Sequence, residues 1–260
     1  RTLQRDLEMI RNEFRIELLY HHDRRGYYID IENSMDFYSY LKFFELSVTA
    51  DILNDLVLKG KDALKFILFD QSGMLEGIEN LKILLASIVK NEFLCINHYN
   101  YDKDKESTYR IKPLYLKEYQ GRWYVGALVD DDDAFLIFGI DRIKKIEITG
   151  KKFQRKNCPD YMSRFRDIIG VSVSSNKKKE KIVLSVDTLN MRYFKSLPLH
   201  HSQVMEQIAD DKYHIGIEVI PNFELKMKIL ALGSRIKVIE PQWLANEIKE
   251  TFKEAVTMYR

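Results

Sequence analysis

Gly121-Arg122-Trp123-Tyr124-Val125 is the stretch of sequence that decides the fold of this chain. Two large aromatic residues follow a glycine directly, which predicts a strand that begins after a tight turn. A second stretch, Phe138-Gly139-Ile140-Asp141-Arg142-Ile143, ends an apolar strand in an arginine. Because successive side chains of a strand point to opposite faces, we expect Trp123 to face the core with Val125 and Ala127. Tyr124 should then point to the other side.

Short strands are predicted on both sides of this stretch. We expect them at residues 93–101, 109–119, 123–129, 135–140 and 143–148, with turn-forming residues between them. The acidic run from Asp130 to Asp133 is interpreted as a solvated hairpin tip, because consecutive carboxylates on a turn rarely converge on one metal ion. Short strands with tight connections favour a small barrel, since closure removes exposed edges.

With Pro113-Leu114-Tyr115-Leu116, these two stretches resemble the WYL domain, whose Trp-Tyr-Leu triplet reads Trp-Tyr-Val here. The resemblance implies an SH3-like or Sm-like β-barrel at residues 93–150. It also implies a bacterial, ligand-sensing transcription factor, because members of this family are mostly such proteins. Some relatives carry a histidine just after the proline, where this chain has Leu114, and this departure leaves the ligand type open.

Aromatic and cationic residues are interleaved on the expected barrel strands. A base stacked on an aromatic ring gains about 1–3 kcal/mol, and guanidinium groups bind phosphate through two hydrogen bonds. The alternative is structural, since Trp123 fits a core position and Arg142 could pair with Asp141. The resemblance favours a binding role for Tyr99, Tyr124 and Arg142. The predicted ligand-binding residues are Tyr99, Tyr101, Arg110, Lys112, Tyr124 and Arg142.

The N-terminal residues 1–31 resemble the recognition helix and wing of a winged helix-turn-helix. Leu3, Leu7, Ile10 and Phe14 recur at helical spacing, and two short strands flank a basic turn. A plain amphipathic helix with a charged hairpin is the alternative. The earlier helices of such a domain are absent, so we expect a truncated form that binds duplex DNA poorly. The predicted DNA-binding residues are Arg1, Thr2, Gln4, Arg5, Arg24 and Arg25.

The rest of the chain divides into three parts. Residues 32–92 have helical periodicity and are expected to form a helical linker that carries signals and helps to form a homodimer. Residues 151–180 are expected to form a linker that is basic at its start and Ser/Asn-rich from Ser172 onward. Residues 181–260 alternate strands and helices in an order that suggests a ferredoxin-like α+β domain and resembles the C-terminal extension that follows WYL domains. We interpret His200 and His201 as structural, because neighbours on an extended segment point apart.

Composition and motifs narrow the function. The order of the predicted elements makes the chain a multidomain α+β protein, and its 45% hydrophobic residues suffice for two or three separate cores. Two distant cysteines fit a reducing, cytoplasmic compartment, and a net charge of +2 argues neither for nor against nucleic-acid binding. It has no stretch long enough for a membrane span, no zinc-binding or cofactor motif, and no catalytic signature. We therefore expect no cofactor, no metal and no enzymatic activity.

The sequence thus predicts a ligand-responsive, homodimeric transcriptional regulator. In the full-length form its winged helix would bind duplex operator DNA, and its sensor would bind a single-stranded nucleic acid, a nucleotide-like effector or another anion. The alternative is an accessory protein whose barrel is itself the main reader of RNA or single-stranded DNA. A metal-dependent nuclease is a third class, which divalent-metal-dependent cleavage would support.

Overall fold

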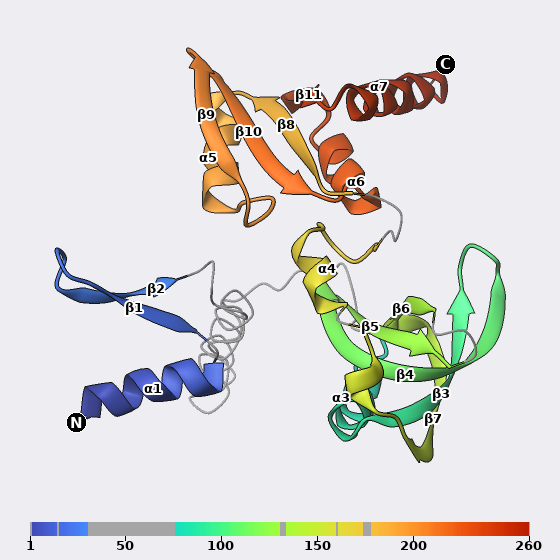
Figure 1. The fold of residues 1–260 in the computed structure, drawn as a ribbon. Helices are drawn as coiled ribbons and strands as arrows, with labels where there is room; N and C mark the ends of the chain where they lie inside the picture. Colours follow the sequence, from blue (N-terminus) through green and yellow to red (C-terminus); the bar gives the residue numbers. More distant parts are fainter. Residues whose placement is uncertain are drawn as a thin grey trace, which may run out of the picture. The chain divides into compact units, whose positions relative to one another are not determined.

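The fold is taken from a computed structural model. It describes residues 2–14, 16–30, 76–130, 134–159, 161–173 and 178–259. The chain forms two compact units, Arg1–Ser72 and Gly73–Arg260 (Figure 1). Predictions for residues 32–75 of the helical linker and for residues 131–133 of the acidic run lie outside the described residues.

The first unit contains a helix and a hairpin. Helix α1 spans Thr2–Phe14, and strands β1 (Glu17–His21) and β2 (Gly26–Asp30) pair antiparallel. Leu18 on β1 is buried, whereas Leu3 at the start of α1 is 63% exposed. Arg11 donates a hydrogen bond to the carbonyl oxygen of Leu18 at 2.5 Å, which fastens the helix to the hairpin. The predicted helix and two strands are therefore present, and their assignment to a winged helix stays a prediction.

The second unit begins with helix α3, Glu79–Lys90. Leu84 and Ile88 lie one helical turn apart on its buried face, while Leu85 and Val89 are exposed. The helix ends at Asn91, whose left-handed backbone lets its amide reach the carbonyl oxygens of the last turn. The prediction of an amphipathic helix is confirmed for this part of residues 32–92.

Five antiparallel strands follow α3. They are β3 (Glu92–Asn100), β4 (Lys105–Tyr119), β5 (Arg122–Val129), β6 (Phe135–Gly139) and β7 (Ile143–Lys152). Their order in the sheet is β6-β5-β4-β3-β7. Strand β4 begins four residues before the predicted start, because its first residues pair with the end of β3. Strands β6 and β7 are the two ends of this hydrogen-bonded order. Closure into an SH3-like or Sm-like barrel stays a prediction.

The turn before the Trp-Tyr-Val triplet has the backbone that the sequence indicates. Gln120 and Gly121 both have positive φ, +50° and +75°, and they join β4 to β5 as a two-residue hairpin loop. Trp123 packs against the core that includes the fully buried Val125 and Ala127. Gly126 lies on the other face, where the ring of Tyr115 covers it so closely that a Cβ atom would come within 2.3 Å. The predicted alternation of the two faces is confirmed.

The predicted linker 151–180 contains ordered structure. Its described part includes a 3-10 turn, η3 (Arg155–Asn157), and a short helix, α4 (Met162–Arg166). Arg155 donates to the carbonyl oxygen of Leu114 on β4 at 2.6 Å. Ile168, Ile169 and Val171 are buried, and Ile169 belongs to the core of the C-terminal domain. Much of this segment is therefore folded, whereas the sequence predicted a linker over its whole length.

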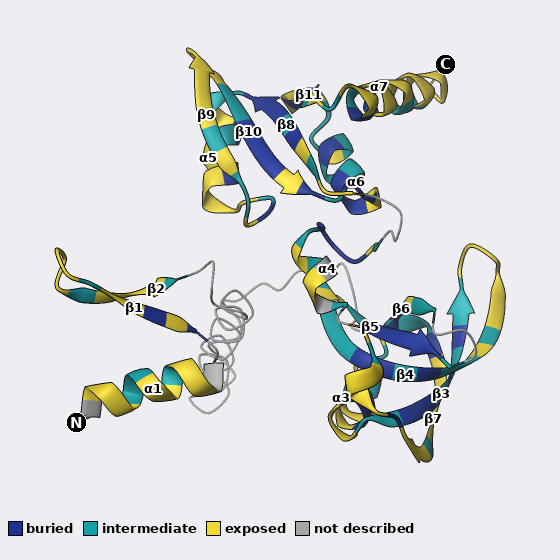
Figure 2. Ribbon diagram, viewed as in Figure 1, coloured by how far each residue is buried: buried dark blue, intermediate teal, exposed yellow. Residues whose placement is uncertain are grey.

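The C-terminal domain has the predicted order of strands and helices. The elements are β8 (Glu180–Val186), α5 (Thr188–Ser196), β9 (Val204–Ala209), β10 (Lys212–Val219), α6 (Phe223–Ala231), β11 (Ile236–Glu240) and α7 (Gln242–Thr257). A short 3-10 turn, η4 (Gly233–Arg235), separates α6 from β11. The strands form one antiparallel sheet in the order β11-β8-β10-β9, and the central strands are its most buried part (Figure 2).

The core of this domain lies between one face of the sheet and its three α-helices. Alternate residues of β8 and β10 point inward, and they meet Phe194 of α5, Leu225 of α6 and Leu244 of α7. Asp187 and Asn222 cap α5 and α6 by accepting hydrogen bonds from backbone amides in the first turn. No helix in the described part of the chain is long and apolar enough to cross a membrane.

Candidate ligand-binding site

A cavity of about 300 Å³ opens on the sheet beside the Trp-Tyr-Val triplet. It is lined by Tyr124 of β5, by residues 135–137 of β6, by Arg142, and by residues 171–173 of the segment that leads to the C-terminal domain. An aromatic ring and a guanidinium group therefore share one concavity. Both were predicted from the sequence as ligand-binding residues, and the fold brings them together from different elements.

Tyr124 reaches the cavity because of its place on β5. It is paired across the sheet with Gly139 of β6, on the face opposite to the core-facing Trp123. Burial raises the pKa of the Tyr124 hydroxyl, while the charges of Arg122 and Arg142 lower it. The phenol is thus neutral at physiological pH and can stack or donate a hydrogen bond.

Arg142 ends the 3-10 turn η2, Ile140–Arg142, which follows β6 directly. Its Nε lies 3.9 Å from Oδ1 of Asp141, and its guanidinium carbon lies 5.3 Å from the ring centre of Tyr101. The same aspartate accepts a hydrogen bond from Nη1 of Arg122 at 3.3 Å. One carboxylate therefore lies between two guanidinium groups, and the local charge is net positive.

Tyr99 and Tyr101 extend this group along the end of β3. Their rings meet edge to face with centres 5.7 Å apart, and the Tyr99 hydroxyl donates to the carboxylate of Asp104. That hydrogen bond is the main cause that raises the pKa of Tyr99. Tyr101 contacts Arg142 directly, so both tyrosines are linked to the cation of the cavity, although neither lines it.

Arg110 and Lys112 lie in a different cluster. They form ion pairs with Asp130 at 3.2 Å and 3.6 Å, and both cations lie over the ring of Phe93. Neither lines the cavity. The structure thus divides the predicted ligand-binding residues into two clusters, and only one of them holds Tyr124 and Arg142.

Sequence reasoning missed several residues of this site. Phe135 lines the cavity and stacks on Tyr161 at 4.1 Å between ring centres, and Asp141 holds the two arginines. Ser172 comes from a segment that was interpreted as linker. A glycine inside an apolar strand, Gly139, is the one signal in the sequence that could have drawn attention to this place.

The segment that supplies residues 171–173 is fixed to the C-terminal domain by a buried carboxylate. Oε1 of Glu224 accepts hydrogen bonds from the amide of Val171 (3.1 Å), the amide of Ser172 (2.9 Å) and the Ser172 hydroxyl (2.7 Å). Asn222 donates to the carbonyl oxygens of Ile169 and Ser172. One wall of the cavity is therefore held by the first turn of α6.

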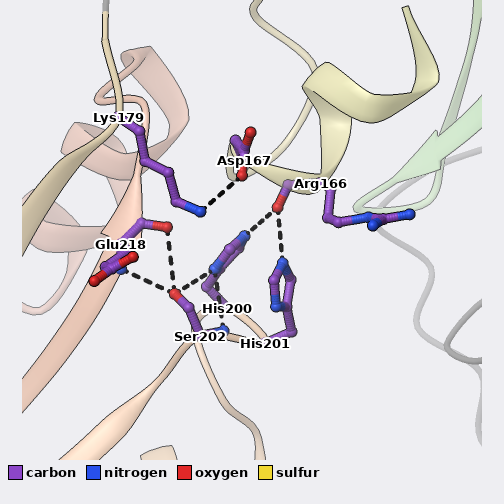
Figure 3. Close-up of polar contacts among 7 residues, drawn as sticks. All are labelled: Arg166, Asp167, Lys179, His200, His201, Ser202 and Glu218. Carbon is purple, nitrogen blue, oxygen red and sulfur yellow. Dashed lines mark hydrogen bonds and ion pairs between the residues drawn. The ribbon is translucent and has the colours of Figure 1, made fainter. Parts of the chain in front are cut away.

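A histidine pair holds the same segment (Figure 3). Nε2 of His200 and Nε2 of His201 lie 2.6 Å and 2.9 Å from the carbonyl oxygen of Arg166. The expectation that the two rings point apart is wrong, since they lie on a turn with centres 4.0 Å apart. Nδ1 of His200 contacts Ser202, and Lys179 pairs with Asp167. Both rings thus contact the backbone of this segment, and the described residues contain no group of three His, Cys, Asp or Glu side chains that could hold a metal ion.

The predicted DNA-binding residues lie in the first unit. Arg1 is outside the described residues, and Thr2 is the first residue of α1. Gln4 and Arg5 are exposed on α1. Arg24 and Arg25 are exposed in the hairpin turn, where Arg25 has a positive φ of +47°. Their contact with DNA stays a prediction.

Two parts of the chain match known domain families. Residues 79–148 match the WYL domain, and residues 178–256 match the WCX domain. No curated protein matches the chain.

Two solved structures are similar in part. One is proteasome accessory factor B/C (PafBC) of Arthrobacter aurescens, with 15% identity and a TM-score of 0.31 over 73% of this chain and 28% of that one. The other is a CRISPR Cas-related protein, with 12% identity and a TM-score of 0.43 over 68% of this chain and 50% of that one. The chain thus spans half or less of the length of either protein.

Proposed function

We propose that this chain, which carries a WYL domain and a WCX domain, is a ligand-responsive transcriptional regulator that binds an anionic, nucleic-acid-derived effector. The effector would occupy the cavity beside Tyr124 and Arg142. Binding there would change the affinity of the N-terminal unit for duplex DNA by favouring one of two conformations. The protein would be a cytoplasmic, bacterial binding protein and not an enzyme.

The shared cavity of Tyr124 and Arg142 is the observation that carries this proposal. About 300 Å³ is at the small end of ligand pockets, which suits one nucleotide or the terminal nucleotide of a strand. A base can stack on the tyrosine while the guanidinium group binds a phosphate through two hydrogen bonds. Asp141 already faces Arg142, but at 3.9 Å it makes no tight pair, so a phosphate can compete for the cation.

The remaining parts of the proposal concern architecture and assembly. We assign α1 and the β1–β2 hairpin as recognition helix and wing, residues 93–150 as an SH3-like or Sm-like barrel, and the C-terminal domain as ferredoxin-like.

We also propose a homodimer formed through the helical linker and the C-terminal domain. The apolar stripe of α7 supports it, because Leu244 and Ile248 are buried whereas Phe252 and Val256 are exposed. Light scattering that reports a monomer at tens-of-micromolar concentration, a scale at which a specific interface should hold, would count against the dimer.

The binding site is tested by fluorescence anisotropy with a short labelled single-stranded DNA. Arg142→Ala should weaken binding by about 1.5–3 kcal/mol, the range for a hydrogen bond to a charged group, and should reduce the salt dependence. Tyr124→Ala should cost about 1–3 kcal/mol with an unchanged salt slope, because stacking releases no counterions. Melting temperatures of both variants show whether the fold is kept.

Arg110→Ala is the matched control for this experiment. Arg110 is a cation on the same sheet, but it pairs with Asp130 and lies outside the cavity. Its loss should therefore change binding by much less than the loss of Arg142. Equal losses in both variants, or folded Tyr124 and Arg142 variants that bind as the wild type does, would show that the cavity is not the binding site. Single-strand binding that leaves duplex binding unchanged would favour the accessory-protein alternative.

A further inference from the structure

Gly139 is a glycine that the backbone does not need. It ends β6 with φ −66° and ψ 127°, an extended conformation that any residue can adopt. A glycine inside a strand costs stability, because it loses more freedom on folding than other residues and has no side chain to pack. The absence of a Cβ atom at this position must therefore matter for something other than the backbone.

The space that a Cβ atom would fill is occupied by two charged side chains. A Cβ built on Gly139 would lie 2.6 Å from Oδ1 of Asp141 and 2.7 Å from both Nε and Nη2 of Arg142. These separations are well below van der Waals contact. Only side-chain ends are involved, so a methyl group could be accommodated by moving the carboxylate and the guanidinium group away while the strand stays in place.

The register of the sheet shows what this packing achieves. Gly139 is the cross-strand partner of Tyr124. Side chains of directly opposed residues lie on the same face, with Cβ atoms about 4.5–5.5 Å apart. The guanidinium group of Arg142 thus lies where a side chain at position 139 would stand, immediately beside Tyr124. The missing side chain lets an arginine three residues later in the chain become the neighbour of the aromatic ring.

We propose that Gly139 is a positioning residue of the ligand site, because the absence of a side chain there lets the Arg142 guanidinium lie beside Tyr124, and any larger residue would displace it. Asp141 faces Arg142 with Oδ1 and forms an ion pair with Arg122 through Oδ2. This inference rests on the proposed function, since it explains how the anion-binding group of that site is placed.

The test compares Gly139→Ala, Arg142→Ala and the double variant in the full chain, with the same labelled single-stranded DNA as probe. Gly139→Ala should weaken binding about tenfold to a hundredfold, as expected for loss of a charge-assisted contact, and lower the salt slope by about 0.7. The double variant should bind no more weakly than Arg142→Ala, because both changes remove the same contact. Gly150→Ala in β7 is the control, since its added methyl group meets nothing within 4 Å although its φ of +70° makes it the more strained backbone.

A second readout needs no ligand. Burial first, and the charge of Arg142 second, lower the pKa of His98 to about 4, while the charge of Asp141 raises it by less than Arg142 lowers it. If an alanine at position 139 displaces the guanidinium group, the midpoint of His98 in an NMR titration should rise, as it should in Arg142→Ala. An unchanged midpoint in Gly139→Ala, or a double variant with an additional loss of affinity, would overturn the role of Gly139. If the wild type fails to bind the probe, the proposed ligand class fails, and the titration still decides the role of Gly139.

Discussion

Replacing Glu224 by alanine should destabilise the C-terminal domain by about 2–3 kcal/mol. Glu224 is only 8% exposed, and its Oε1 is the shared acceptor for three donors of residues 171 and 172. The change removes that acceptor from a place where water has poor access. It should also release the wall of the ligand cavity that residues 171–173 form.

The magnitude follows from the three contacts. The amide of Val171 is buried, and an unsatisfied buried donor costs about 1–3 kcal/mol. The two donors of Ser172 are partly buried, so water can replace much of what they lose. The carboxylate also lies in the first turn of α6, where a negative charge contributes about 0.3–1 kcal/mol. Against this, Oε2 of Glu224 is buried without a partner, and removing it relieves a desolvation cost.

Glu224→Gln should be of intermediate stability. It keeps an acceptor for the three donors but loses the charge, and it places an amide donor where Oε2 has no partner. The exposed Glu250 is the matched control on α7, because its ion pair with Lys253 is solvated and its loss should change stability by less than about 0.5 kcal/mol.

Urea denaturation followed by tryptophan fluorescence measures these changes. The chain has two tryptophans, and a Trp123→Phe background leaves Trp243 at the start of α7 as the reporter of the C-terminal domain. We expect the free energy of unfolding to fall in the order wild type, Glu224→Gln, Glu224→Ala. A Glu224→Ala variant that is as stable as Glu250→Ala would refute the reasoning. Water would then replace the carboxylate as acceptor for the donors of residues 171 and 172 at no cost in stability.

Two further predictions concern the WYL-matching part of the chain. Gly77→Ala should lower the melting temperature, because its φ of +76° favours glycine and its Cβ atom would lie 2.4 Å from the carbonyl oxygen of Ile140; a melting temperature equal to that of Gly150→Ala would contradict this. His98 has a pKa lowered to about 4, first by burial and then by Arg142, so the unfolded chain binds one more proton than the folded chain between about pH 6.5 and 4. Its contribution to the free energy of unfolding is therefore complete above about pH 6.5 and is lost as pH falls through about 4, by up to about 1.4 kcal/mol per pH unit. Denaturation at several pH values should show that the free energy of unfolding depends less steeply on pH in His98→Gln than in the wild type. An identical pH dependence in the two proteins would show that the pKa of His98 is not lowered.

Local patterns in the sequence determined most of the secondary structure. The glycine turn at residue 121, the alternation of Trp123 and Tyr124, and the cap residues of α5 and α6 act through neighbours in the chain, so their effect can be read without the fold. The element order of the C-terminal domain follows for the same reason. The choice of Tyr124 and Arg142 also came from the sequence, with the help of the resemblance to the WYL domain.

Only the tertiary structure decided which of the predicted residues share the cavity and which other residues join them. Arg110 lies on a predicted strand and Arg142 between two predicted strands, but only the register of the sheet and the position of Asp130 place one outside the cavity and the other inside it. Val171 and Ser172 lie in the predicted linker because nothing nearby in the sequence shows that Glu224, more than fifty residues later, accepts their hydrogen bonds. Gly139 has an ordinary backbone, and its role depends on a cross-strand partner and a side chain that folds back over it. Contacts between residues distant in the chain depend on packing and register, and no local pattern records them.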